Sequence, residues 1–145
     1  MVIGGKKLFE EIDKPIGRKI LSESSEETEI EASWTGELKG FNGFPDGKKV
    51  GSGNSVQGKN GVTISHWQGV FTTSDGQELL FEGRDMSKNN KFVVLRTYFT
   101  NSDKLTWMNG LICVLEGEFN PITREFKSVG YEWVGKYKFS ISDYS

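Results

Sequence analysis

The sequence predicts an all-β fold, an antiparallel meander closed into a barrel of about eight strands. Three observations support it: apolar and polar residues alternate with a period of two, turn-forming segments with many of the 18 glycines separate these runs, and no amphipathic helix exceeds two turns. A meander of seven to nine strands must protect its edges, and closure into a barrel is the usual solution. An open sandwich is the alternative.

The strands follow from these runs. Apolar and polar residues alternate most clearly over Glu29–Leu38, which predicts a strand with one solvent-exposed face. Val62–Thr73 and Glu78–Arg84 flank the turn Ser74–Gly76 and are predicted to form a hairpin. The charged segment Asp85–Asn90 is predicted to be a loop.

The C-terminal half continues with β-branched and aromatic residues at Lys91–Thr100. After the turn Asn101–Lys104, Trp107–Phe119 is predicted to be a long strand with a bulge at Asn109–Gly110. A turn at Asn120–Pro121 leads to a returning strand at Phe126–Val134.

The remaining segments are less regular. We predict a short helical turn near Leu8–Ile12, then a strand at Arg18–Ser22. The glycine-rich stretch Lys39–Lys59 is predicted to be a mobile loop flanking one short strand. Tyr137–Ile141 is a candidate final strand.

Length and composition predict a single domain over residues 1–145, large enough to fold without disulfides or metal. The net charge of −2 lacks the basic excess of nucleic-acid binders, so we expect no nucleic-acid partner. One cysteine, no signal peptide and no apolar run of membrane-spanning length favour a cytoplasmic protein with no membrane contact.

Several chemistries are excluded by the residue inventory. Cys113 and His66 are the only cysteine and the only histidine, which excludes a structural zinc site and most catalytic ones. There is no Gly-x-Ser-x-Gly elbow for a serine nucleophile, and no P-loop or dinucleotide-binding fingerprint. We therefore expect no metal and no cofactor.

Following the strands in register gives two faces. The predicted core face carries Trp67, Phe71, Leu79, Phe81, Val93, Leu95, Phe99, Trp107, Leu111, Cys113, Leu115, Phe119, Val129, Tyr131 and Trp133. The opposite face mixes apolar with polar residues: Val62, Ile64, His66, Gln68, Val70, Leu80, Glu82, Arg84, Phe92, Val94, Arg96, Tyr98, Met108, Ile112, Val114, Glu116, Glu118 and Glu132. This mixed face has three interpretations: the outer surface with cross-strand ion pairs, the interface of a homo-oligomer, or the wall of a ligand cavity.

On the cavity interpretation, one set of polar residues is predicted to bind a ligand: Arg96, Tyr98, Glu116, His66, Glu82 and Asn109. An arginine paired with a carboxylate could hold a ligand carboxylate or enolate. Tyr98 could donate to an oxyanion, and a glutamate in an apolar wall could exchange a proton.

The C-terminal half also resembles small uncharacterised β-barrel families of bacteria and archaea. The resemblance rests on Asp75–Gly76, Arg96–Thr97, Thr100–Ser102, Lys104–Leu105, Trp107–Gly110 and Glu116, with Met108 where leucine is usual. The opening Gly5–Glu11 and Gly17–Leu21 are similar to the start of one such family. The resemblance implies a lipocalin-like or allene oxide cyclase-like barrel and carries no activity.

Three functional hypotheses remain. The favoured one is binding of a small, partly apolar molecule with Arg96 as the polar anchor. The second is an isomerase or cyclase that uses Glu116 or Tyr98 for proton transfer in the same cavity. The third is an assembly role without a ligand.

Overall fold

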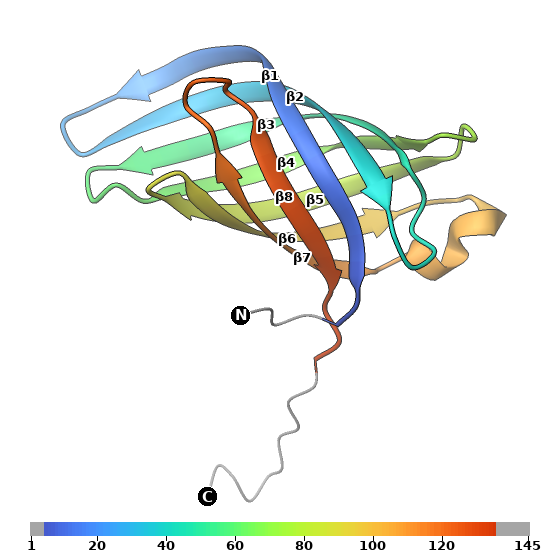
Figure 1. Ribbon diagram of the computed structural model, residues 1–145. Coiled ribbons are helices and arrows are strands. Elements are labelled where there is room, and N and C mark those ends of the chain that lie inside the picture. Colours follow the sequence, from blue (N-terminus) through green and yellow to red (C-terminus); the bar gives the residue numbers. More distant parts are fainter. Residues whose placement is uncertain (1–4, 136–145) are drawn as a thin grey trace, which may run out of the picture.

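The computed structural model describes residues 5–135, which form one closed barrel of antiparallel strands (Figure 1). Each strand pairs with its neighbours in the sequence, and β1 pairs with β8 to close the ring. The strands are β1 (Lys7–Glu23), β2 (Glu27–Gly40), β3 (Gly47–Gly58), β4 (Thr63–Thr73), β5 (Glu78–Lys88), β6 (Lys91–Phe99), β7 (Ile112–Phe119) and β8 (Phe126–Glu132). The predicted eight-stranded meander and its closure are confirmed, and the open sandwich is wrong.

The turn between β5 and β6 is shorter than the sequence suggested. Asn89 and Asn90 have φ angles of 55° and 64°, the left-handed values that a two-residue type I′ hairpin requires and that asparagine tolerates. Strand β5 therefore runs to Lys88, which pairs with Lys91. The predicted loop Asp85–Asn90 is wrong because four of its residues belong to the strand.

This turn decides which side of β6 faces inward. In a two-residue hairpin, residues equally far from the turn share a face, and Arg96 lies opposite Gly83 while Tyr98 lies opposite Phe81. Arg96 and Tyr98 therefore point into the barrel. The predicted face of this strand was inverted, since Val93, Leu95 and Phe99 of the expected core are 43%, 55% and 51% exposed. The residues that point inward on β6 are Phe92, Val94, Arg96 and Tyr98.

Two N-terminal predictions are also wrong. The helical turn at Leu8–Ile12 is the start of β1, and most of the predicted loop Lys39–Lys59 is the long strand β3. Strand β3 carried no apolar alternation because its inward positions hold glycine, serine and Lys49. These small residues leave room for side chains from neighbouring strands: a methyl group at Gly53, for example, would clash with the Trp67 ring.

The segment before β7 also differs from its prediction. Residues Asp103–Met108 form a short 3-10 helix, η1, and the strand begins only at Ile112. Helix η1 is much too short and too polar to cross a membrane, and the described residues contain no membrane-spanning helix. The candidate strand Tyr137–Ile141 lies outside the described residues.

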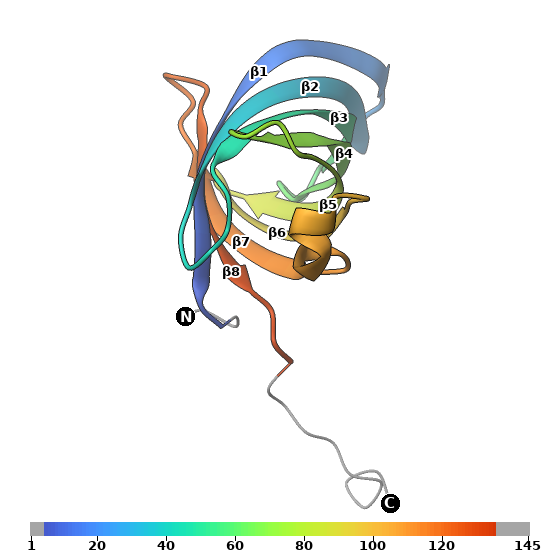
Figure 2. The same ribbon diagram turned by 90° about the vertical axis from the view of Figure 1, so that its right-hand side faces the viewer.

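One end of the barrel is plugged. Phe44 from the β2–β3 connection and Met108 from η1 are 4% and 0% exposed, and they join the apolar core of the barrel at this end. Figure 2 shows η1 over the near end of the ring of strands. The core comprises Leu8, Phe9, Leu38, Phe44, Phe71, Leu79, Phe81, Val94, Tyr98, Met108, Cys113 and Leu115. The opposite end, where the β3–β4, β5–β6 and β7–β8 turns lie, is hollow.

Candidate ligand-binding site in the barrel interior

The hollow end of the barrel is a cup with two levels. The upper level is a cavity of about 390 Å³ near the hairpin turns, within the size range of small-molecule sites. The lower level is a smaller cavity of about 60 Å³ near the middle of the barrel. The two levels share the lining residues Trp34, Trp67, Asp85, Phe92 and Phe126, so they adjoin at this ring of side chains.

Aromatic rings form the walls of this cup. Trp34 packs edge-on against Phe126 with ring centroids 4.5 Å apart, and against Trp67 at 5.9 Å. Phe92 continues the wall at 5.5 Å from Phe126. Edge-to-face packing is a favoured arrangement of aromatic rings, and these rings give the cup an apolar wall.

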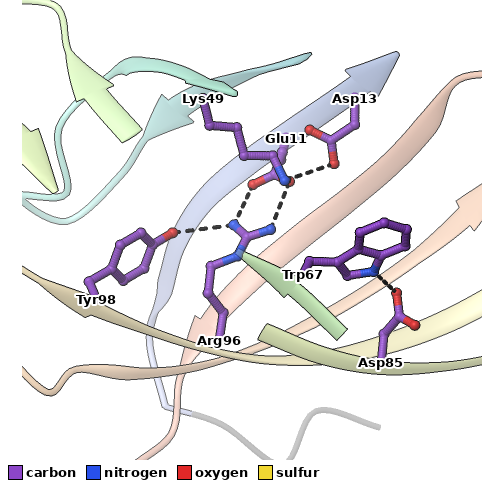
Figure 3. Close-up of polar contacts among 7 residues, drawn as sticks. All are labelled: Glu11, Asp13, Lys49, Trp67, Asp85, Arg96 and Tyr98. Carbon is purple, nitrogen blue, oxygen red and sulfur yellow. Dashed lines mark hydrogen bonds and ion pairs between the residues drawn. The ribbon is translucent and has the colours of Figure 1, made fainter. Parts of the chain in front are cut away.

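The floor of the cup is a buried ion network (Figure 3). The Arg96 guanidinium donates from Nη1 and Nη2 to the two oxygens of Glu11, at 2.6 and 3.0 Å. Lys49 Nζ lies 2.8 Å from Glu11 Oε2 and 3.3 Å from Asp13 Oδ2. Arg96 Nη1 also donates to Tyr98 Oη at 3.2 Å. Glu11 and Arg96 are 1% and 5% exposed, so this network is largely shielded from water.

A glycine makes room for this arrangement. Gly36 on β2 pairs with Asp13 across the sheet, and a methyl group there would clash with Asp13 Oδ1 and the Lys49 side chain. The absence of a side chain at Gly36 therefore lets the carboxyl and the ammonium group lie side by side inside the barrel.

Three polar atoms of the cup have no hydrogen-bond partner among the described residues. They are Asp13 Oδ1, Asp85 Oδ1 and Trp34 Nε1, and all three are buried. Asp13, Asp85 and Trp34 all line the lower cavity. The second oxygen of Asp85 accepts a hydrogen bond from Trp67 Nε1 at 2.9 Å. Buried polar groups are almost always paired in folded proteins, so these three mark a place where a partner is expected.

The two carboxyl groups on β1 have opposite proton affinities. Burial raises the pKa of Glu11, but the charges of Arg96 and Lys49 outweigh it and hold that pKa well below its ordinary value. Burial raises the pKa of Asp13, and the neighbouring charge on Glu11 raises it further. Burial also raises the pKa of Asp85, against the hydrogen bond from Trp67 Nε1. Asp13 and Asp85 are thus the floor groups that most readily take up a proton.

The six residues predicted to bind a ligand do not lie together. Arg96 is in the floor and Tyr98 lies beneath it, packed between Phe44 and Phe71. Glu116 is exposed on the outer face of β7.

His66 and Glu82 pair with each other on the outer face, Nε2 to Oε1 at 3.0 Å. Asn109 bonds both backbone groups of Thr100 and ties the end of η1 to β6. None of these three contributes to the cup. A ligand-binding role for any of the six stays a prediction.

The sequence analysis missed Glu11, Lys49 and Asp85 because each lay in a segment predicted to be a helical turn or a loop, and it missed Asp13 because that residue lay in a segment assigned to no strand. Two signals could have found them. The acids of β1 alternate with Ile12, which is 43% exposed, so the usual pattern is inverted there. The Asn89–Asn90 pair between two extended runs indicates a two-residue hairpin and would have fixed the inward side of β6.

Within residues 5–135, no group of three or more histidine, cysteine, aspartate or glutamate side chains is arranged to hold a metal ion. Cys113 is buried, and burial raises its pKa to about 12, so it stays a neutral thiol.

The sequence matches no known protein family and no well-characterised protein. Its fold is similar to that of a protein of unknown function from Clostridium acetobutylicum, with a TM-score of 0.75, 15% identity, and coverage of 89% of this chain and 98% of that one. A β-barrel-like protein from Acinetobacter baumannii has a TM-score of 0.70 and 14% identity, covering 88% and 94% of the two chains. An enzyme from Penicillium herquei has a TM-score of 0.65 and 19% identity, covering 86% and 91%. These likenesses establish a barrel shared with uncharacterised bacterial proteins and one fungal enzyme.

Proposed function

We propose that the barrel binds a small, partly apolar molecule in the cup, with the apolar body against the aromatic walls and a polar end at the floor. The observation that carries the proposal is the set of three buried, unpaired polar atoms of Asp13, Asp85 and Trp34 around one cavity. Leaving such groups unpaired costs about 1–3 kcal/mol each, and a ligand that pairs them recovers part of that cost on binding.

The dimensions of the cup agree with this role. The upper level, at about 390 Å³, suits a body of up to about three rings, and the lower level suits a terminal group of about four non-hydrogen atoms, since one water needs about 10–15 Å³. Few convergent polar groups in an otherwise apolar wall are the usual composition of a small-molecule site.

A filled cup tests the proposal. Ala32 is 6% exposed and lines the upper level, so Ala32→Phe places a ring in the cavity. Its neighbour Glu31 is exposed on the other face of β2, so Glu31→Phe is the matched control. We expect the neutral fluorescent probe N-phenyl-1-naphthylamine to bind the parent protein and Glu31→Phe equally, and Ala32→Phe at least tenfold more weakly. Equal uptake by a folded Ala32→Phe protein would refute a ligand site in the cup.

A second candidate is an enzyme of the isomerase or cyclase type. The observation that favours it is the pair Glu11 and Asp13, in which one carboxyl is held ionised and the other favours the protonated form. Neighbouring groups with separated pKa values are the usual arrangement for acid–base catalysis. One protein of similar fold, from Penicillium herquei, is an enzyme, which agrees with this candidate. Glu11 and Asp13, rather than Glu116 or Tyr98, are the residues this candidate requires.

A further inference from the structure

The floor of the cup has an imbalance between its cations and its carboxylates, and this imbalance selects among ligand classes. The lower cavity is lined by the cations Lys49 and Arg96 and by the carboxylates Glu11, Asp13 and Asp85. With all five groups ionised, the two cations and three carboxylates leave one net negative charge. An uncompensated charge is costly in a site shielded from water.

The positive groups of the floor are already occupied. Both terminal nitrogens of Arg96 donate to Glu11, and Nη1 also donates to Tyr98. Lys49 lies between Glu11 and Asp13. An anionic ligand group would have to displace these contacts, so the floor is a poor site for a carboxylate or an enolate.

The carboxylates, in contrast, have oxygens without a hydrogen-bond partner. Asp13 Oδ1 and Asp85 Oδ1 have no partner within the described part of the chain, and both residues line the same cavity. The raised pKa values of Asp13 and Asp85 agree with an excess of negative charge, which either a proton or a cation relieves.

The walls suit a cation as well. The faces and edges of five aromatic rings surround the lower cavity: Trp34, Trp67, Phe81, Phe92 and Phe126. Aromatic faces attract positively charged groups, and Phe81 already has Lys49 Nζ at 5.2 Å and Arg96 Cζ at 5.3 Å from its centroid. The cations Arg18, Lys88 and Arg124 line only the upper level, where all three are exposed and therefore screened by solvent.

We infer that the ligand is an organic cation, with a protonated amine or amidinium group at Asp85 and a flat apolar body between the aromatic walls. This inference rests on the proposed binding function and specifies its ligand class. An ammonium group beside Asp85 Oδ1 gives that buried oxygen a partner and offsets the one net negative charge of the fully ionised floor. The indole N–H of Trp34 remains for an acceptor elsewhere on the ligand.

Three probes of one shape and different charge test the inference. We propose isothermal titration calorimetry at neutral pH with 2-phenylethylamine, 2-phenylethanol and 3-phenylpropionate. The amine is expected to bind at least tenfold more tightly than the alcohol, and the carboxylate more weakly than either. A carboxylate or alcohol that binds as tightly as the amine would overturn the cation assignment.

Two variants connect the preference to the floor. In Asp85→Asn the side chain keeps an oxygen for the Trp67 hydrogen bond but loses its charge. We expect this change to weaken amine binding at least tenfold and alcohol binding by less than about threefold. Glu78→Gln, at an exposed position on the outer face of the same strand, is the matched control and should change neither. An unchanged amine affinity in Asp85→Asn would also overturn the assignment.

The dye measurement separates the two proposals. If N-phenyl-1-naphthylamine enters the cup and none of the three probes binds, the cation assignment is wrong and the binding function stands. If the dye does not enter, the binding function is wrong and the assignment falls with it.

Discussion

The buried contact between Glu11 and Arg96 should be strongly coupled. Replacing Glu11 with leucine leaves a guanidinium that is 5% exposed without the two hydrogen bonds it makes now. Replacing Arg96 with methionine leaves a carboxylate that is 1% exposed and keeps only Lys49 within salt-bridge distance. Breaking a buried ion pair from one side costs about 3–5 kcal/mol. We expect each single variant to lose about that much unfolding free energy.

The double variant Glu11→Leu/Arg96→Met removes one charge of each sign, so the net charge of the cup floor is unchanged. Replacing a buried pair by apolar residues of similar volume is often neutral or stabilising, and we expect a cost of at most about 2 kcal/mol. The coupling energy is then at least about 4 kcal/mol, because two losses of at least about 3 kcal/mol become one of at most about 2 kcal/mol.

Urea unfolding followed by circular dichroism gives the unfolding free energy of the parent protein, the two single variants and the double variant, provided that their m-values are the same. The exposed pair Glu37 and Lys48, 3.9 Å apart, is the control, and Glu37→Leu should change stability by less than about 1 kcal/mol. A double variant as unstable as the sum of the two singles would refute the reasoning, because it would mean that the two charges do not stabilise each other.

Three further predictions concern the floor, the β5–β6 turn and the outer face. Because the folded-state pKa of Asp13 is raised above its ordinary value of 3.8, its contribution to stability is lost as pH rises through the raised pKa. Asp13→Asn should remove this fall from a plot of unfolding free energy against pH, and an unchanged plot would contradict a raised pKa for Asp13. Asn90→Ala should lower the unfolding free energy, measured with urea, by about 1 kcal/mol because the φ of 64° at this position is left-handed, whereas Asn90→Gly should not lower it. Equal losses in the two variants would argue against the type I′ turn. We also expect the protein to be a homo-oligomer, because Leu80 is 59% exposed on the outer face and lies between Val70 and Phe99. Light scattering should show that Leu80→Lys dissociates this oligomer, and a monomeric parent protein would rule the expectation out.

Much of the fold was predictable from the sequence because it depends on local patterns. The alternation in β2, the β4–β5 hairpin and the aromatic run of β6 each specify a strand within about ten residues. Because the connections between the strands are short, closure into a barrel followed from the need to protect the sheet edges.

The site was less predictable because it reverses the pattern on which the prediction depends. Glu11, Asp13 and Lys49 are polar residues at inward positions, so a sequence rule that assigns polar residues to the outside moves them to a turn or a loop. Their true position is stable only because β1, β3 and β6 bring carboxylates and cations from distant parts of the chain within hydrogen-bond distance.

The sequence by itself determined that the chain is an antiparallel β meander with one histidine, one cysteine and no motif for a known cofactor. Only the tertiary structure decided that Glu11 lies against Arg96 inside the barrel and neutralises its charge. Strand identity depends on neighbours along the chain, whereas the inward side of a strand depends on register. Here two asparagines at one turn set that register for β6, and the carboxylate partner of its arginine comes from β1, near the other end of the sequence.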